Sequence, residues 1–480
     1  MFTQHLMASL SRCLLISFSW ALARSPDFVG AGLCSTLGVL TYTFSSRRHD
    51  ILSALDHAFP EKDMAWKHRI CRLHCTRMFE MFLIVLAMRH WSPKEMKERL
   101  KFTPSYSAFF DGPAKDRPSV LLLTHASTTE AMAVLPVTGA GFPKTMALYR
   151  ALDNPAAETF VKESREFAGN SLYARREGLL KAKKALQSGR NAVAILFDQS
   201  AGHSGHLSLL FDRLCTTSNL ASMLTAKTNA ISAILYVRRD GFWRGTMSVR
   251  QLPDTNEPDR LLRAANAELE SILRESDSQC ADWFWAHKRW KATIRNESIL
   301  NLKVLKTYLP QELEARGLDS PPRTTRIALR LDPRLELIPF AQTVADFIRH
   351  QRPDAQVWLL APSTLPKDRL PAHDEMFTLP SEAKERKGVL KAINAERFPD
   401  ALISLDPNLD AVSEAKLFQC DFRGGFAYSA PAKRSFHAHL VINSEAYLKS
   451  PYSAMIDFLE KLGISRSDTE IHFLAPPPLA

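Results

Sequence analysis

The sequence predicts an α/β protein with an N-terminal membrane segment and two α/β domains. Short apolar runs alternate with helical stretches from about residue 119 to 237, and a second alternation of the same kind begins at residue 326. A polar segment with three prolines, 309–325, separates the two patterns and indicates a linker. We therefore divide the chain into a membrane anchor (1–48), a first α/β domain (49–308), a linker (309–325) and a Rossmann-like α/β half-domain (326–480).

The N-terminal region is apolar. Phe28–Phe44 contains no charged residue, and a shorter apolar run at 13–23 precedes it. A membrane-spanning helix needs about 20 apolar residues, so one tilted span or an interfacial hairpin fits this region. The basic segment 47–49 then places the following domain on the cytoplasmic side. A cleaved signal peptide and a buried helix of a soluble protein are the alternatives.

The expected elements follow from the length and period of the apolar runs. In the first domain, the strands are expected at 119–124, 145–149, 192–197 and 231–237, and the helices at 155–167, 178–188 and 218–228. In the second domain, the strands are expected at 326–331, 356–361 and 401–405, with a helix at 337–350. Functional residues are expected where parallel strands end at their carboxyl side.

The composition limits the partners. The 62 basic and 51 acidic residues give a formal charge of +11, which favours an anionic membrane surface, phosphorylated lipids or an acidic carrier protein. The basic stretch 175–190, with Lys288, Arg289 and Lys291, is either a solvated surface or a docking face. No aromatic-basic pattern typical of nucleic-acid binding appears, so we expect no nucleic-acid partner.

The seven cysteines are scattered, which favours a reducing compartment over a disulfide framework. The cluster of His68, Cys71, His74 and Cys75 has no zinc-binding spacing and is predicted to lie on one helix. We expect no metal and no cofactor.

A histidine and a carboxylate follow a predicted strand, at the carboxyl end where functional residues are expected. The strand SVLLLT ends at His125, and Glu130 follows five residues later, in the first turn of a helix. A neutral imidazole can take the proton of an alcohol as the alcohol attacks a thioester. A carboxylate can fix the tautomer of that imidazole and stabilise the imidazolium. Alone, the His-x4-Glu spacing is a weak signal.

Further segments make the signal specific. Five ordered blocks accompany His125 and Glu130 along the chain: ALDHAFPEK (54–62), LYRALDNP (148–155), LFDQSAG (196–202), LLFDRLCTTS (209–218) and WFWAHKRWK (283–291). On these blocks and the His125–Glu130 spacing, the chain resembles the lipid A late acyltransferase family, whose members transfer lauroyl or myristoyl chains, over about residues 10–295.

The resemblance implies a glycerol-phosphate-acyltransferase-like fold and an O-acyltransferase of the inner membrane with a cytoplasmic catalytic domain. The acyl donor would be acyl-carrier protein or acyl-CoA, and the acceptor a lipid A precursor or another saccharolipid or phospholipid. His125 would be the base and Glu130 its partner, with the substrate site formed by Arg150, Asn154, Asp198 and Gln199. The chain departs from the family at Ser127–Thr129, where Gly-Asn-Trp is usual, and at Asp212, where glycine is favoured.

The C-terminal part resembles another family. Residues 326–361 and 401–429 are similar to the N-terminal half of the heptosyltransferases (glycosyltransferase family 9), but the turn 332–336 lacks that family's glycines. The resemblance stops where the sugar-nucleotide-binding half would begin, so we expect a binding or docking module without sugar transfer. The alternatives to acyl transfer are a catalytically lapsed membrane scaffold and a bifunctional acyl- and glycosyltransferase.

Overall fold

The computed structural model describes residues 15–139, 141–149, 151, 154–293, 296–302, 305–307, 309–430 and 435–464. The chain forms two compact units. The first consists of Met1–Leu55, Pro60–Gln199 and Thr217–Lys288, and the second of Asp56–Phe59, Ser200–Thr216 and Arg289–Ala480. Both are built on parallel sheets, which confirms the α/β prediction.

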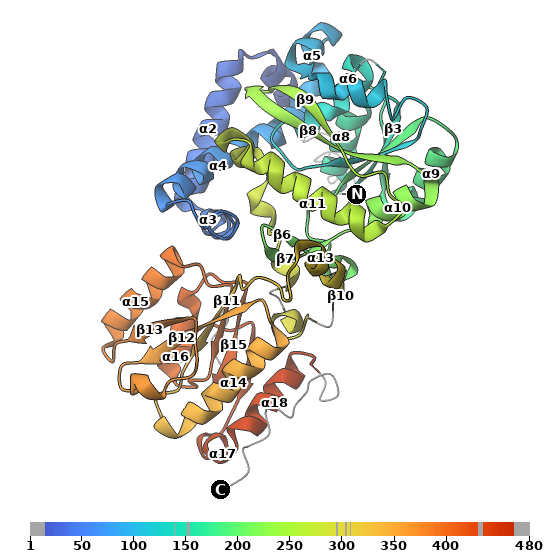
Figure 1. The fold of residues 1–480 in the computed structure, drawn as a ribbon. Coiled ribbons are helices and arrows are strands. Elements are labelled where there is room, and N and C mark those ends of the chain that lie inside the picture. The colour runs from blue at the N-terminus through green and yellow to red at the C-terminus, as the bar shows by residue number, and fades with distance from the viewer. Residues whose placement is uncertain are drawn as a thin grey trace, which may run out of the picture. The chain divides into compact units, whose positions relative to one another are not determined.

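The first unit contains a 7-stranded sheet with the order β1-β9-β8-β2-β5-β3-β4 (Figure 1). Its strands pair in parallel except β8 and β9, which form an antiparallel pair. The four strands expected from the sequence are present, and β1, β4 and β9 complete the sheet. The strands are β1 (Leu100–Phe102), β2 (Ser119–Leu123), β3 (Lys144–Tyr149), β4 (Ser171–Ala174), β5 (Asn191–Leu196), β8 (Ile231–Gly241) and β9 (Arg244–Gln251).

Helices cover both faces of this sheet. One face packs on buried side chains such as Ile84, Met132 and Leu135, and the other on helices that include α9 and α10. Gly178 lets α9 approach β3, because a Cβ there would lie 2.4 Å from a methyl carbon of Leu148. The longer helices are α2 (Asp27–Phe44), α3 (Arg47–Ala58), α4 (Met64–Ala87), α8 (Pro155–Glu166), α9 (Arg175–Gln187), α10 (Leu220–Thr228) and α11 (Pro258–Arg274); the shorter ones are α5 (Pro93–Arg99), α6 (Pro104–Phe110), α7 (Leu135–Thr138) and α12 (Asp277–Asp282).

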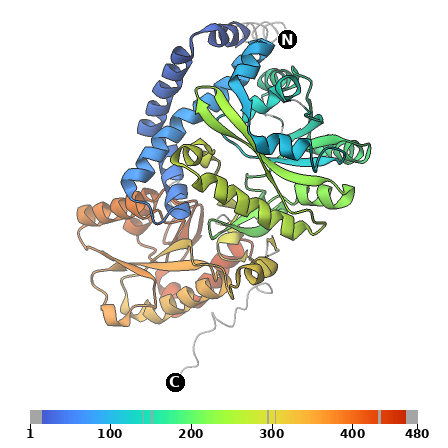
Figure 2. The same cartoon turned by 45° about the horizontal axis from the view of Figure 1, so that its top comes forward.

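The N-terminal helices carry exposed apolar side chains. Helix α2 packs along α4 (Figure 2), yet Phe28, Val39 and Phe44 on α2 are 76%, 61% and 81% exposed. In the described part of the chain, no single helix has the length and apolar character of a membrane span, although α2 and α3, bent by 85°, reach them together. The membrane anchor expected from the sequence therefore stays a prediction.

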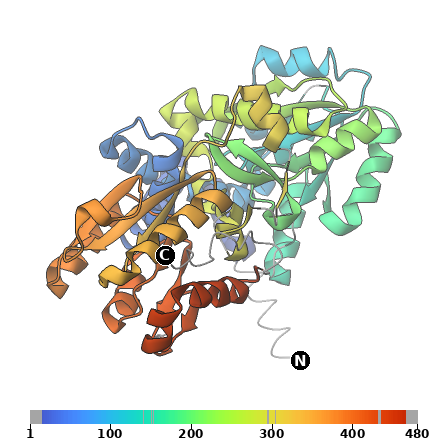
Figure 3. The same ribbon diagram turned by 60° about the horizontal axis from the view of Figure 1, so that its bottom comes forward.

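The second unit contains a 6-stranded, fully parallel sheet with the order β13-β12-β11-β14-β15-β16. Numbered from β11, this is the 3-2-1-4-5-6 order of a Rossmann fold. Helices α14, α17 and α18 cover one face and α15 and α16 the other (Figure 3). The elements are β11 (Thr325–Arg330), α14 (Ile338–Gln351), β12 (Ala355–Pro362), β13 (Glu375–Leu379), α15 (Ala383–Glu396), β14 (Ala401–Ser404), α16 (Leu409–Glu414), β15 (Phe422–Ala427), β16 (Ala438–Val441), α17 (Ser444–Lys449) and α18 (Pro451–Lys461).

A small sheet, β10-β6-β7, also belongs to the second unit. Its strands are β6 (His206–Leu210), β7 (Arg213–Thr217) and β10 (Lys306–Thr307), and helix α13 (Leu309–Arg316) packs against β6. The first half of the segment expected to be a linker is thus helical, because its proline stands in the first turn, where proline is compatible with a helix. The buried Glu312 of α13 accepts a hydrogen bond of 2.9 Å from the backbone N–H of Leu209.

A buried ionic cluster joins distant segments inside this unit. The Asp400 carboxylate contacts the guanidinium of Arg213 and lies 3.2 Å from Nε2 of His57. Burial, together with the charge of Arg213, lowers the pKa of His57 to about 3. The neighbouring Asp56 forms an ion pair of 2.5 Å with Arg326 on β11.

Candidate active site

Two neighbouring parallel strands end together and bring a histidine and an aspartate into contact. Leu123, the last residue of β2, is in register with Leu196, the last residue of β5. His125 and Asp198 each follow two residues later. Nδ1 of His125 lies 2.6 Å from Oδ1 of Asp198, and the backbone N–H of His125 donates to Oδ2 at 2.7 Å. The register of the sheet therefore creates the pair.

Asp198 is fully buried and held from several sides. The indole Nε1 of Trp283 donates to Oδ2 at 2.6 Å, and Nε2 of His287 lies 2.7 Å from the main-chain oxygen. Burial alone would raise the pKa of Asp198, but the charge of His125 and its hydrogen bonds hold this pKa well below its usual range. Asp198 is therefore ionised at neutral pH.

The ionised Asp198 determines the tautomer of His125. A carboxylate only accepts hydrogen bonds, so Nδ1 of His125 carries the proton and Nε2 keeps its lone pair. The His125 side chain is 16% exposed, and the side-chain nitrogen of Gln199 lies 3.0 Å from Nε2. The arrangement presents a basic nitrogen to a substrate while its other nitrogen is fixed.

Glu130 occupies a different position from the one expected. After His125 the chain enters the 3-10 helix η2 (Thr129–Val134), and the Glu130 carboxylate contacts the guanidinium of Arg165 on α8 at 2.5 and 2.8 Å. The carboxylate that contacts the imidazole of His125 is Asp198. The contact of His125 with Glu130, expected from their spacing and from the family resemblance, is corrected accordingly, and any role of Glu130 in the reaction stays a prediction.

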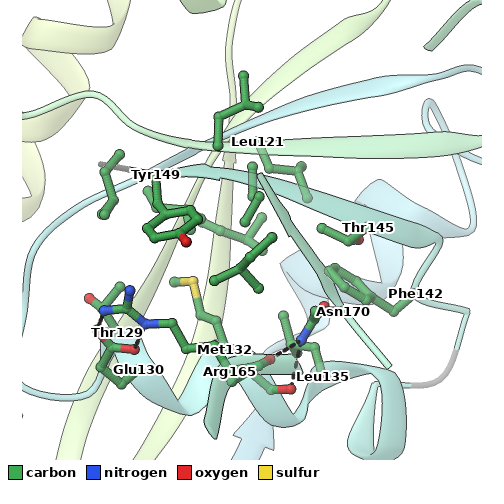
Figure 4. Close-up of a pocket in the computed structure, with 18 residues that line it drawn as sticks. Leu121, Thr129, Glu130, Met132, Leu135, Phe142, Thr145, Tyr149, Arg165 and Asn170 are labelled. Carbon is green, nitrogen blue, oxygen red and sulfur yellow. Dashed lines mark hydrogen bonds and ion pairs between the residues drawn. The ribbon is translucent and has the colours of Figure 1, made fainter. Parts of the chain in front are cut away.

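An apolar cavity lies next to this site. It has a volume of about 100 Å³ and is bounded by β2, β3, β4, β5 and η2. Most of its lining is apolar, with Glu130, Arg165 and Tyr149 toward one end and Phe142, Thr145 and Asn170 toward the other (Figure 4). The end with Glu130 adjoins the His125 loop, because Thr129, which also lines the cavity, accepts a hydrogen bond from the N–H of Ala126 at 2.9 Å.

The other residues singled out in the sequence are Arg150, Asn154 and the basic residues at 288–291. Arg150 lies outside the described residues. Asn154 is exposed and precedes α8, and its carbonyl accepts a hydrogen bond of 2.9 Å from the N–H of Glu158. Of the basic residues at 288–291, Arg289 is buried and Lys288 pairs with Asp50 at 3.0 Å.

Several residues of the site were not identified from the sequence. The block 283–291 contributed to the family resemblance without any of its residues being assigned to the site, yet Trp283 and His287 contact Asp198. Arg165 lay in a predicted helix without a distinguishing feature. Only the position of Asp198 just after a strand was a usable signal, since parallel strands place functional residues there.

Comparison with known proteins identifies the family of the chain. A search of curated proteins found no match. The model of the family described as bacterial lipid A biosynthesis acyltransferase matches residues 3–292, which include the His125–Asp198 pair and the cavity. The match covers more than half of the chain, so this protein belongs to the bacterial lipid A biosynthesis acyltransferase family.

Proposed function

We propose that this acyltransferase moves a fatty acyl chain from a thioester, with acyl-carrier protein as the donor, to a hydroxyl of a lipid A precursor. The observation that carries the proposal is the bond between His125 and the buried Asp198 beside an apolar cavity. The bond leaves the second imidazole nitrogen basic, and the cavity provides the dry, apolar surroundings that an acyl chain requires.

The proposed reaction uses His125 as a general base. Its Nε2 takes the proton of the acceptor hydroxyl while the hydroxyl oxygen attacks the thioester carbonyl. The tetrahedral intermediate then collapses, the carbon–sulfur bond breaks, and the imidazolium returns its proton to the leaving thiolate. Asp198 stabilises the imidazolium in between. Gln199 lies in front of Nε2, so its side chain must rotate to admit the hydroxyl.

The cavity is the proposed site of the acyl chain. Leu121, Leu123 and Leu196 line it from the two strands that carry His125 and Asp198, so a bound chain would end near the reacting nitrogen. Arg165 and Glu130 close one end as an ion pair. We propose that this polar end meets the thioester or the headgroup of the acceptor, where an arginine can bind an anionic oxygen.

We also propose that the protein acts at the cytoplasmic face of the inner membrane. The exposed Phe28, Val39 and Phe44 of α2 support this location, because aromatic rings and aliphatic side chains bury themselves in a lipid interface. The exposed lysines of α9 support an anionic partner, either the carrier protein or lipid phosphates.

The proposal is tested with the purified full-length protein, an acyl-carrier-protein thioester and a lipid A precursor, with the acylated product measured by mass spectrometry. We expect transfer by the wild type and a loss of about 10²–10⁴ in kcat for His125→Ala. A wild type that binds these substrates without transferring the chain would instead support the lapsed scaffold. Lipid analysis of a deletion strain would show which acyl chain is missing.

A further inference from the structure

The loop that carries His125 is fixed by the segment that also supports Asp198. The carbonyl of His125 accepts a hydrogen bond of 2.8 Å from the N–H of Phe284, and Ala126 forms an antiparallel bridge with Trp283. Trp283 in turn donates to Asp198. One short stretch of chain, 282–284, therefore sets the positions of both members of the pair.

Asp282 adds a side-chain bond to this stretch. Its Oδ1 accepts the hydroxyl hydrogen of Ser127, while its main-chain oxygen accepts from the N–H of Ser127 at 3.3 Å. Asp282 and Ser127 are both 2% exposed. Ser127 stands at one of the positions where this chain departs from the usual Gly-Asn-Trp sequence of the family that it resembles.

The carboxyl group of Asp282 is buried among charged side chains. Burial raises its pKa to about 6, while the charge of Arg77 and the bond from Ser127 oppose this rise. Arg77 of α4 lies 3.9 Å away and also donates to the main-chain oxygen of Ser278. The other charged groups that face Asp282 are Glu80 of α4 and Arg239 of β8, which form an ion pair of 2.8 Å with each other.

Oδ2 of Asp282 is buried without a hydrogen-bond partner in the described part of the chain. A carboxylate held in this way costs folding free energy, and an apolar pair of similar volume is often more stable. Stability alone does not explain the arrangement. Besides the charge of Arg77, the carboxylate is contacted by the hydroxyl of Ser127, which donates a hydrogen bond to it from a position two residues beyond His125.

We propose that Asp282 is a positioning residue for His125 and acts through Ser127. The inference rests on the role proposed for His125 and deepens it. The ionised carboxylate holds the Ser127 hydroxyl, which keeps the His125 loop in register with 282–284. Loss of the hydrogen bond between Asp282 and Ser127 lets the imidazole of His125 move relative to Asp198 and to the thioester. A displacement of about 1 Å can lower the rate by about 10²-fold.

The test compares Ser127→Ala, Asp282→Asn and the double variant with Asp277→Asn. Asp277 lies on the same helix, α12, but contacts Trp66 and Arg69 at the surface, so it controls for loss of a nearby acid. We expect kcat to fall about 10- to 100-fold in each single variant, with KM changed less than about threefold, because the anchor positions the base and does not bind substrate. The double variant should be no worse than the more severe single one.

The pH dependence separates positioning from a general loss of structure. In the wild type, protonation of Asp282, whose pKa burial raises to about 6, should contribute to a fall of kcat at acidic pH. Both Ser127→Ala and Asp282→Asn remove this contribution from the profile, so the slope of log kcat against pH on the acidic side should be smaller than in the wild type by about one. Asp277→Asn should keep the wild-type profile.

Two results would overturn the inference. The first is a kcat within about twofold of wild type for both Ser127→Ala and Asp282→Asn, measured where His125→Ala is inactive. This result would refute the positioning role of Asp282 and leave the proposed function of His125 intact. The second is an acidic slope of log kcat against pH in Ser127→Ala that equals the wild-type slope. Near wild-type turnover by His125→Ala would instead remove the role of His125 itself.

Discussion

Replacement of Asp198 by asparagine tests the centre of the mechanism. The two side chains have nearly the same shape, but the amide carries no charge and brings two N–H donors. The donors around Asp198 are arranged for a carboxylate: the backbone N–H and Nδ1 of His125 and the indole of Trp283 all point at its oxygens. Asparagine can satisfy them only in part.

The expected loss has two components. A charge-assisted hydrogen bond is worth about 1.5–3 kcal/mol, which corresponds to about 10- to 150-fold in the stability of the imidazolium. In addition, an amide N–H facing Nδ1 favours the tautomer that protonates Nε2, and this tautomer cannot act as a base. The same substitution at the aspartate of a serine-protease triad lowers kcat by about 10⁴ for this reason. We therefore expect Asp198→Asn to lower kcat by about 10²–10⁴.

Glu130→Gln is the matched comparison, because it makes the same chemical change at the carboxylate that contacts Arg165. Turnover of acyl-carrier-protein thioester is measured for both variants by mass spectrometry, with circular dichroism and thermal melting to show that both are folded. We expect the loss in Asp198→Asn to exceed that in Glu130→Gln by at least about tenfold. An equal or larger loss in a folded Glu130→Gln variant would refute the assignment of Asp198 as the partner of His125.

Four further outcomes are expected. Ala147→Phe fills part of the cavity, so the length of the preferred acyl chain should shorten in competition assays with mixed thioesters. Asp400→Ala leaves Arg213 buried without its carboxylate, so the free energy of unfolding should fall by about 3–5 kcal/mol in denaturant titrations. The pKa of His57 is lowered to about 3 in the folded protein, so on acidification the unfolded chain binds a proton before the folded chain does. The free energy of unfolding should therefore decrease by about 1.4 kcal/mol per pH unit below about pH 6.5, and less steeply in His57→Asn. Thermal melts across about pH 4.5–6 measure this difference. The pKa of Asp282 is raised to about 6 in the folded protein, so above that pH its ionised form lowers the free energy of unfolding by about 3 kcal/mol. Asp282→Asn should therefore have a melting temperature no lower than that of the wild type at about pH 7.5, although the variant is less active.

The strands were predictable because their apolar runs are continuous. The runs at 119–124 and 192–197 predicted β2 and β5, and the position of His125 after the first run marked the site. The contact with Asp198 was not predictable, since it depends on which strands are neighbours and on their register. Spacing along the chain favoured Glu130 instead, but the 3-10 turn of η2 directs that side chain to Arg165.

The division into units was harder to predict for a similar reason. Proline and polar residues indicated a boundary near residue 309, and that signal is local. The inclusion of Asp56–Phe59 and Ser200–Thr216 in the second unit depends on long-range contacts, such as those of Asp400 with His57 and Arg213. No pattern within either short segment reveals them.

The interleaved second unit has a consequence for synthesis on the ribosome. Asp400 follows Arg213 by 187 residues, which corresponds to about 10–40 s of translation at about 5–20 residues per second. Throughout that interval Arg213 lacks the carboxylate that neutralises it, and the hairpin of β6 and β7 also lacks β10 until residues 306–307 are made, about halfway through. Nascent chains that stall in this window would expose unpaired strand edges, which make incompletely folded chains prone to aggregation.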